Sequence, residues 1–314
     1  MLLITGATGF VGQALVRQAL TRGLDVRAAV RKSIRELGRQ VETCAVGDIG
    51  PDTNWQAALQ NVHTVIHTAA RVHVMNDKTA DPLAEFRRVN VAGTLNLARQ
   101  AASSGVKRLV FVSFIKVNGE ATLPGQPFRP SDQHIPVDPY GLSKYEAEMG
   151  LRAIALETGL EVVIVRPPLV YGPGVKANFA AMVRWLKRGV PLPLGAVLHN
   201  RRSLVALDNL VDLLLVCATH PAAAHQTFLA SDGEDLSTTG LLRRIGQALG
   251  KPVRLLPVPV ALLKRGAASM GKADVAQRLL GSLQVDISKN TQLLGWKPPL
   301  SVDEGLKKAT ANFV

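Results

Sequence analysis

A glycine-rich turn at the start of the chain constrains the fold more than any other feature. The apolar run Leu2–Thr5 leads into Gly6-Ala7-Thr8-Gly9-Phe10-Val11-Gly12, and an amphipathic helical pattern follows and ends at Gly23. In this GxxGxxG spacing, the first glycine permits a tight turn and the second lets backbone N–H groups approach a pyrophosphate. The third allows the helix to pack closely on the strand. The turn predicts a dinucleotide-binding unit; the alternative is an ordinary glycine-rich connection between strand and helix.

Short apolar runs alternate with helical patterns through the first half of the chain. The apolar runs are residues 2–5, 26–30, 64–68, 108–113 and 162–166, and the helical patterns are residues 12–22, 55–60, 86–103 and 140–158. Strands that are buried on both faces and alternate with helices form a parallel sheet covered on both sides. The sequence therefore predicts an α/β fold with a Rossmann-type, doubly wound parallel sheet.

The pattern changes after about Pro167, where proline and glycine clusters and further helical patterns replace the alternation. We expect residues 1–168 to form the dinucleotide-binding domain and residues 169–314 to form a smaller, mainly α-helical substrate lobe. The chain is expected to return to the sheet near residues 200–220, so that the two parts are interleaved.

The charge balance calls for an anionic partner. The chain has 37 lysines and arginines against 24 aspartates and glutamates, a formal charge of +13. Nucleic acid is disfavoured, because aromatic residues make up only 4% and the basic residues are scattered along the chain. The apolar stretch 204–218 is interrupted by Asp208 and Asp212, so we expect no integral membrane segment. Weak peripheral membrane contact through residues 260–272 stays open beside the alternative of an ordinary lobe helix.

The cysteines and histidines predict neither a disulfide nor a metal site. Cys44 and Cys217 are far apart in sequence and belong to no CxxC pair, which is typical of free thiols in a reducing cytoplasm. The seven histidines, among them His67 and His73, have no acidic or cysteine partners at ligand spacing. No leader peptide is recognisable, so a cytoplasmic location is expected.

The end of the second apolar run indicates which dinucleotide is bound. An NAD site usually carries an acidic residue there for the ribose 2′-hydroxyl, whereas this run ends in Arg31-Lys32. A guanidinium in that place would pair with a 2′-phosphate, so NADP(H) is favoured and NAD(H) stays possible. The alternative is a solvated basic loop. Asp48, in Gly47-Asp48-Ile49, is placed to accept a hydrogen bond from the adenine amino group.

Tyr140 and Lys144 form a YxxxK pair at the start of a helical pattern. Residues four apart project from one face of a helix, so the two side chains are neighbours. An ammonium group lowers the pKa of a nearby phenol, and a tyrosinate can then exchange a proton with a substrate hydroxyl or ketone. The alternative is an unremarkable surface pair.

With these motifs in order, the chain resembles an extended short-chain dehydrogenase/reductase of the NAD-dependent epimerase/dehydratase family. The resemblance rests on residues 5–12, Gly47-Asp48, His67-Thr68-Ala69-Ala70, Asn90-Val91-Ala92-Gly93-Thr94, residues 140–144, residues 166–174 and Leu294-Gly295-Trp296-Lys297-Pro298. These motifs cover nearly the whole length in the order that the family shows.

The resemblance implies roles for particular residues. Tyr140 would be the acid/base, Lys144 would also anchor the cofactor ribose, and Asn90 would brace the central helix. Further cofactor contacts would come from Ile49, Ala69, Ala70, Arg71 and Pro167. The resemblance also implies a homodimer through the helices of residues 86–103 and 140–158.

One position departs from the family pattern. Members carry a serine or threonine whose hydroxyl bonds the reacting oxygen, and the alignment on Val117 to Gly119 puts Phe114 there. Ser113 stands one residue before it and is our candidate for the missing catalytic hydroxyl. In an extended strand neighbouring side chains point to opposite faces, so Ser113 can serve only if the backbone turns.

The resemblance also places the other end of the substrate. Lys116, Asn118, Asn178 and Arg201 correspond to residues that hold a UDP-sugar, with Arg201 on the diphosphate. The surrounding stretches resemble bacterial surface-polysaccharide enzymes, of the kind used in O-antigen biosynthesis, that act at C4 of UDP-N-acetylhexosamines.

Because Arg31-Lys32 favours NADPH, and a reductase must exchange its dinucleotide in each cycle, we expect a reductase of a UDP-4-keto-6-deoxy-N-acetylhexosamine. A UDP-hexose or UDP-N-acetylhexosamine 4-epimerase is the first alternative. A non-catalytic NADP(H)-binding sensor protein is the second, because it would explain Phe114.

Overall fold

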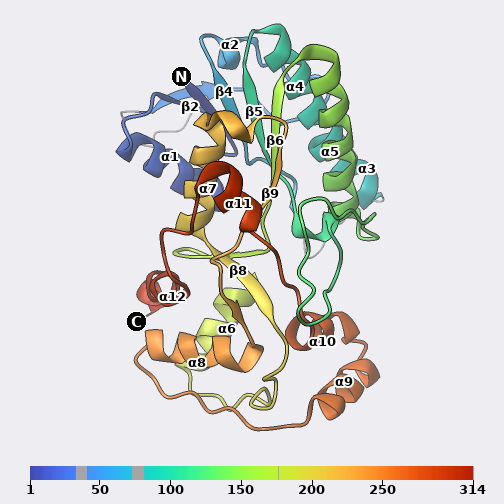
Figure 1. Ribbon diagram of the computed structural model, residues 1–314, viewed down its shortest axis with the longest axis vertical. Helices are drawn as coiled ribbons and strands as arrows, with labels where there is room; N and C mark the ends of the chain where they lie inside the picture. Colours follow the sequence, from blue (N-terminus) through green and yellow to red (C-terminus); the bar gives the residue numbers. More distant parts are fainter. Residues whose placement is uncertain (33–40, 73–80, 176, 314) are drawn as a thin grey trace.

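A parallel sheet and the helices that cover it form the larger part of the molecule (Figure 1). The computed structural model describes residues 1–32, 41–72, 81–175 and 177–313, without the side chains of residues 177, 178 and 312. Within this part of the chain, seven parallel strands lie in the order β3-β2-β1-β4-β5-β6-β9. Their bounds are β1 Leu2–Thr5, β2 Val26–Val30, β3 Glu42–Ala45, β4 Thr64–His67, β5 Arg108–Val112, β6 Glu161–Arg166 and β9 Thr227–Leu229.

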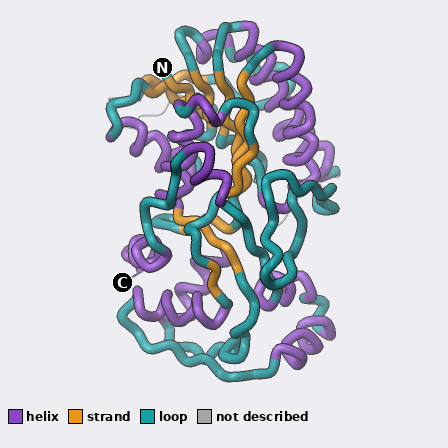
Figure 2. Tube along the Cα trace, viewed as in Figure 1, coloured by secondary structure: helices purple, strands orange, loops and turns teal. Residues whose placement is uncertain are grey.

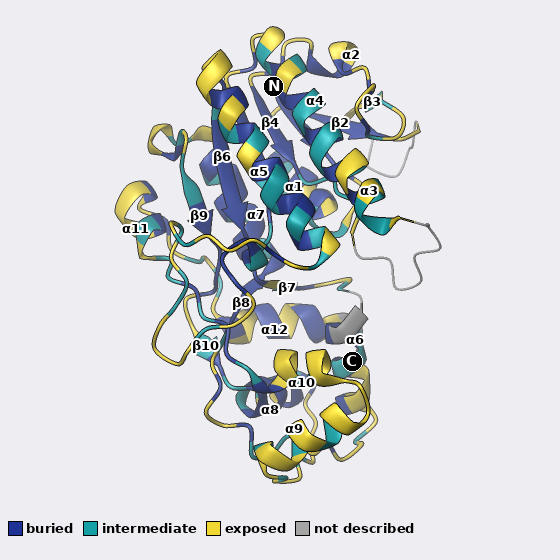
Figure 3. Ribbon diagram, turned by 90° about the vertical axis from the view of Figure 1, so that its right-hand side faces the viewer, coloured by how far each residue is buried: buried dark blue, intermediate teal, exposed yellow. Residues whose placement is uncertain are grey.

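Helices cover both faces of this sheet, which makes three layers (Figure 2). One face packs against α1 Phe10–Thr21 and α7 Leu207–Thr219, with α11 Ser288–Leu294 at its edge. The other packs against α2 Gln56–Leu59, α4 Gly93–Ser103 and α5 Pro139–Thr158. The central strands are dark in Figure 3 because side chains on both of their faces are buried, as in β1, where every residue is buried. The edge strand β3 is the exception, since none of its residues is buried. The predicted doubly wound α/β fold is confirmed.

The predicted helix over residues 86–103 is built from two helices and an irregular turn. α3 Pro82–Phe86 begins with Asp81, whose carboxylate accepts the Ala84 N–H, and a π-helical segment Arg87–Ala92 leads into α4. A π-helical turn re-aims the side chains within it and is frequent at functional sites. Asn90 is the buried residue of this segment.

The second lobe has its own small sheet and apolar core. Strands β7 Leu169–Tyr171, β8 Arg202–Ala206 and β10 Asp235–Leu236 pair in the order β10-β8-β7. Around them lie α6 Ala177–Lys187, α8 Thr238–Ala248, α9 Val260–Ser269, α10 Ala273–Leu280 and α12 Val302–Thr310. α7, β9 and α11 follow residue 168 and still belong to the layers of the large sheet, so the two parts alternate along the chain.

A buried carboxylate joins the two parts. Asp232 accepts hydrogen bonds from the Tyr171 hydroxyl, the Asn209 amide and the Ala206 N–H, each at 2.7 Å. Tyr171 belongs to β7 and Ala206 to β8, whereas Asn209 lies on α7 over the large sheet. Burial is the main cause that raises the pKa of Tyr171, so the phenol stays a proton donor to Asp232.

None of the described helices is both long and apolar enough to span a bilayer.

Candidate active site

The glycine turn leaves the start of α1 open to an anion. Gly6 has φ +68°, and a Cβ on Gly12 would lie 2.0 Å from the Gly6 carbonyl oxygen. No side chain caps the helix at Gly9, and its first turn contains no acidic residue. The first backbone N–H groups of a helix without a cap lack partners and favour phosphate. The turn therefore fits the pyrophosphate of a dinucleotide, with Thr8 and Gly9 exposed beside it.

The residues predicted to hold the adenine end lie together. Arg31 follows β2 and Asp48 follows β3, and their side chains form an ion pair with Arg31 Nη1 3.9 Å from Asp48 Oδ1. Both side chains are 82% exposed, and Lys32 is exposed as well. Ile49 is partly buried behind them, with its Cγ2 in the space that a Cβ on Gly93 would fill. Lys32 therefore faces solvent beside the Arg31–Asp48 pair, where the adenine end of a dinucleotide is expected.

The carboxyl end of β4 is bonded to strand β1 on one side and to helix α4 on the other. Thr5 Oγ1 lies 2.6 Å from His67 Nδ1, and His67 Nε2 lies 3.0 Å from Thr94 Oγ1. Burial, followed by the nearby Lys144, lowers the pKa of His67 to about 3, so this imidazole is neutral. Ala69 and Ala70 follow β4 and are partly exposed. The backbone of Ala69 packs so closely on Gly6 that a Cβ on Gly6 would clash with it.

Asn90 fixes the backbone of residue 71. Its Oδ1 accepts the Arg71 N–H at 2.8 Å, and its Nδ2 donates to the Arg71 carbonyl at 3.0 Å. The same Nδ2 donates to Ser143 Oγ at 3.0 Å on α5. The π-helical segment thus connects the end of β4 to the helix that carries Tyr140.

Tyr140 and Lys144 lie on the first turns of α5. The helix begins at Pro139 after Asp138, whose side chain accepts the Gly141 N–H at 2.9 Å. The Lys144 ammonium donates to the Val112 carbonyl at 2.9 Å and lies 4.5 Å from the centroid of the Phe111 ring. Both side chains therefore project toward the carboxyl end of β5.

Two aromatic rings enclose Tyr140. The ring centroids of Phe86 and Phe114 lie 5.9 Å and 5.2 Å from that of Tyr140. Burial, and then Asp138, raises the pKa of Tyr140 to about 12, and burial lowers that of Lys144 to about 7. The expected lowering of the phenol pKa is therefore not found in the ligand-free protein, because burial disfavours the charged form of each group.

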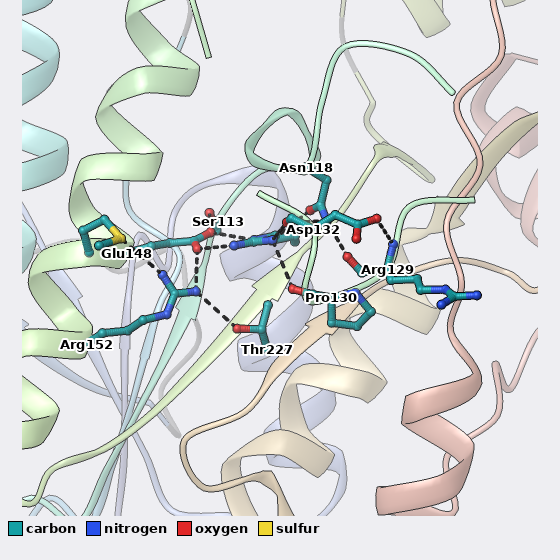
Figure 4. A network of polar contacts seen from close by, with 10 residues as sticks. Ser113, Asn118, Arg129, Pro130, Asp132, Glu148, Arg152 and Thr227 are labelled. Atoms are coloured by element: carbon teal, nitrogen blue, oxygen red, sulfur yellow. Dashed lines mark hydrogen bonds and ion pairs between the residues drawn. The ribbon is translucent and has the colours of Figure 1, made fainter. Parts of the chain in front are cut away.

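The structure does not bring Ser113 or Asn118 to Tyr140. The Ser113 hydroxyl donates to Glu148 Oε1 at 2.5 Å (Figure 4). The backbone at Phe114 is extended, so the Phe114 side chain points to the opposite side. Asn118 donates to the carbonyls of Arg129 and Asp132, and its Oδ1 accepts from Arg166. Both side chains are used within the protein. The predicted catalytic role of Ser113 and the predicted substrate contact of Asn118 thus have no support in this geometry.

Lys116 and Pro167 lie at the edge of the site. Lys116 Nζ is 3.2 Å from Asp138 Oδ2 and 3.1 Å from Glu120 Oε2, so it lies beside the residue that precedes the helix of Tyr140. The Pro167 carbonyl accepts the Ile115 N–H at 3.2 Å and ties the end of β6 to the 3-10 turn Ile115–Val117.

In the second lobe, Arg202 has a more suitable environment for binding an anion than the predicted Arg201. Arg201 is exposed and donates to the carbonyls of Leu198 and Asn200, while the side chain of Asn178 lies outside the described residues. Arg202 is half-buried, and its pKa is lowered by burial and then by Arg278. Among the described residues no carboxylate pairs with Arg202, which donates only to the Gly281 carbonyl at 3.3 Å.

A guanidinium that has no carboxylate partner among the described residues, and whose charge a second arginine disfavours, is suited to bind an anion. The position of Arg202 as the first residue of β8 was a usable signal in the sequence. Arg278, on α10, belongs to no recognisable motif.

Together, the glycine turn, the Tyr–Lys pair and the strand order define a Rossmann-type enzyme of the short-chain dehydrogenase/reductase class. A family model described as NAD dependent epimerase/dehydratase family matches residues 2–229. The chain belongs to this family.

Relatives and solved structures agree with this assignment. The chain is 51% identical over 316 residues to a UDP-glucose 4-epimerase of Vibrio cholerae, covering 100% of this chain and 95% of the relative. It is also similar to the solved UDP-glucose 4-epimerase of Thermotoga maritima with UDP-glucose, at 23% identity and a TM-score of 0.74 over 99% and 98% of the two chains. The UDP-glucuronic acid 4-epimerase of Bacillus cereus in complex with NAD matches with a TM-score of 0.78, at 19% identity over 99% and 97%. At these identities the two solved structures show the shared fold.

Replacing Gly12 should abolish dinucleotide binding. In Gly12→Ala the new Cβ cannot lie 2.0 Å from the Gly6 carbonyl, so the turn and α1 must separate. We expect NAD(P) affinity to fall more than about tenfold in isothermal titration calorimetry. The reason is that the backbone N–H groups at the start of α1 no longer point at the pyrophosphate. Gly23→Ala, beyond the other end of α1, adds the same methyl group at a glycine with φ +71°, where it meets no atom within 4 Å. It should keep wild-type affinity, and equal losses in both variants would contradict the prediction.

Proposed function

We propose that the chain is an NAD(P)-dependent 4-epimerase of a UDP-hexose or UDP-N-acetylhexosamine. The observation that carries the proposal is the 51% identity to a UDP-glucose 4-epimerase along the whole chain. This reverses the order of our sequence-based expectation, which put reduction of a UDP-4-keto-6-deoxy-N-acetylhexosamine first. The comparisons support the epimerase and give no specific support to the keto-sugar reductase.

The chemistry divides between the cofactor and two side chains. A bound nicotinamide dinucleotide would supply the hydride acceptor and donor at C4. Tyr140 Oη takes the proton of the C4 hydroxyl when the sugar is oxidised and returns it when the sugar is reduced. Lys144 is largely an ammonium below pH 7, given its pKa of about 7, and its charge favours the tyrosinate. Phe86 and Phe114 exclude water from the phenol.

The dinucleotide is held by the glycine turn and selected at the end of β2. The exposed Arg31 and Lys32 support NADP(H), as the sequence suggested. The Arg31–Asp48 pair equally leaves NAD(H) possible, because exposed ion pairs contribute about 0–1 kcal/mol and separate easily. Ala69, Ala70 and the backbone of Arg71 held by Asn90 would line the nicotinamide end.

The decisive experiment supplies UDP-glucose, UDP-galactose and their N-acetylated forms to the purified protein without added dinucleotide. We expect reversible interconversion of the C4 epimers by NMR, with a tightly bound dinucleotide identified by mass after acid release. A reductase, which the basic residues Arg31 and Lys32 favour as second candidate, would convert none of these sugars. It would instead oxidise NADPH in equal amounts with a UDP-4-keto sugar. Binding without turnover in either assay would indicate the sensor.

Phe114 is predicted to limit the rate, because it leaves the reacting oxygen without the hydroxyl that the family places there. Phe114→Ser is expected to raise kcat about tenfold or more, since a missing donor to the reacting oxygen costs about 10²–10³ in rate. Phe114→Ala removes the ring without supplying a hydroxyl and is the matched control. Steady-state epimerisation rates measure both variants. An equal rate in Phe114→Ser and Phe114→Ala would show that the hydroxyl is not needed.

We assign the UDP diphosphate to Arg202 and Arg278 in place of Arg201. Arg202→Met is expected to raise KM for the UDP-sugar about 10- to 100-fold with little change in kcat, because charge-assisted hydrogen bonds to each phosphate are lost. Arg201→Met removes the neighbouring exposed charge and should leave KM within about twofold. The reverse pattern in initial-rate kinetics would restore Arg201 as the binding residue.

The remaining expectations stay predictions. A homodimer would use the helices of residues 86–103 and 140–158, and on the second of these Met149 is 46% and Leu156 is 90% exposed. Cytoplasmic location, a place in O-antigen synthesis and peripheral membrane contact through residues 260–272 stand as stated from the sequence.

A further inference from the structure

A fully buried carboxylate lies directly beyond the Tyr–Lys pair. Glu148 follows Lys144 by four residues on α5 and is 0% exposed. Its oxygens accept from the Ser113 hydroxyl at 2.5 Å, from Arg166 Nε at 2.9 Å and Nη2 at 2.6 Å, and from Arg152 Nη2 at 3.0 Å (Figure 4). Two guanidinium groups and a hydroxyl thus satisfy both oxygens of this buried carboxylate.

Arg166 extends the network to the loop segment 129–132. It lies at the end of β6, and its Nη1 donates to Asn118 Oδ1 at 3.0 Å and to the carbonyls of Pro130 and Asp132 at 3.4 and 3.1 Å. Asn118 in turn donates to the carbonyl of Arg129 at 2.7 Å. The carboxylate therefore fixes α5 against the ends of β5 and β6 and against the segment 129–132, which leads on to Asp138 and Tyr140.

The bond to Ser113 sets the direction of the next side chain. Phe114 has φ −151° and ψ 140°, which is extended backbone, so its side chain points away from that of Ser113. With Ser113 held by Glu148, the Phe114 ring faces Tyr140 at 5.2 Å between centroids. The residue that we expected to act on the substrate thus orients the residue that faces Tyr140.

Glu148 lies one turn after Lys144 on the same face of α5, whereas Glu146, two residues after Lys144, pairs with Arg87. From the other elements, Lys144 is faced by the Val112 carbonyl and Phe111 ring of β5 and by the neutral His67 of β4. Tyr140, a neutral phenol at neutral pH, lies one turn earlier on the same face, and Arg166 and Arg152 lie beyond Glu148. Burial lowers the pKa of Lys144 to about 7, and Glu148 opposes this shift.

We propose that Glu148 is a positioning residue that keeps the charge on Lys144 and, through Ser113, the orientation of Phe114 toward Tyr140. The part of this inference that concerns catalysis rests on the proposed function. The carboxylate touches neither substrate nor cofactor and acts through its neighbours. Its loss should therefore change the protonation of Lys144 even in protein that holds no ligand.

The test is a lysine titration of the cofactor-free protein. With ¹³C-labelled lysine, the Cε resonance of Lys144 is identified by its absence in Lys144→Met, and its pKa is measured by NMR. In Glu148→Gln we expect this pKa to fall by about one unit or more, because the ammonium loses its anion in a site of low dielectric. If the unpaired Arg166 prevents folding, Glu148→Gln/Arg166→Met removes both buried charges and should show the same direction.

The matched control is Glu161→Gln, at the other end of the same two strands. Glu161 accepts from the buried Arg108 at 2.8 Å, so the variant breaks a comparable pair far from α5's first turns. It should destabilise the protein without moving the pKa of Lys144. An unchanged Lys144 pKa in the Glu148 variants, or an equal shift in Glu161→Gln, would overturn the proposal.

Kinetics provide a second readout. In an active enzyme, Glu148→Gln should move the alkaline limb of kcat to lower pH, since Lys144 loses its proton earlier, while KM for the UDP-sugar stays unchanged. Glu148→Asp, which keeps the charge, should restore the limb in part. A wild-type protein without turnover would refute the proposed function alone, because the lysine titration requires no activity.

Discussion

The approach of helix α1 to strand β1 is the constraint on which the rest of the site depends. Only a residue without a side chain fits at Gly12, where the helix meets the Gly6 carbonyl. From β1 the chain builds outward in both directions, to β2 and β3 on one side and to β4, β5, β6 and β9 on the other. All seven strands end at the same edge, so their following residues converge on the crevice beside β1.

Burial tunes the side chains at that edge before any ligand arrives. It lowers the pKa of His67 to about 3 and of Lys144 to about 7, and it raises that of Tyr140 to about 12. Each shift favours the uncharged form. Without a ligand, the site therefore contains the neutral phenol of Tyr140 beside the Lys144 amine, which is about half protonated near pH 7. A tyrosinate–ammonium pair has to be created by what binds, which links proton transfer to the arrival of ligands.

Much of the fold and one half of the site were predictable from sequence. The glycine turn, the basic end of β2 and the Tyr–Lys pair are local patterns, and each carries its geometry with it. The alternation of apolar runs and helical patterns likewise determined the parallel sheet, because strands covered on both faces leave a distinct apolar signature. The π-helical segment 87–92 left no such signature, since its sequence reads as ordinary helix.

The substrate half was harder because it depends on contacts between distant segments. Ser113 and Asn118 are polar residues next to the expected catalytic position, and sequence alone could not show that Glu148 and Arg166 use them internally. Arg201 and Arg202 are adjacent and chemically identical, and only burial separates them. Arg278 lies on a helix and is 76 residues after Arg202, so the role proposed for it depends on tertiary structure.

The carboxylate of Asp232 has a consequence for how ligands enter. A rigid swing of the second lobe would separate Asp232 either from Asn209 on α7 or from Tyr171 and Ala206 of the small sheet, and the buried carboxylate would lose donors in both cases. The connection between the two parts at Asp232 is therefore rigid. Access to the crevice has to come from movement at the periphery of the lobe, such as α9, in which no residue is buried.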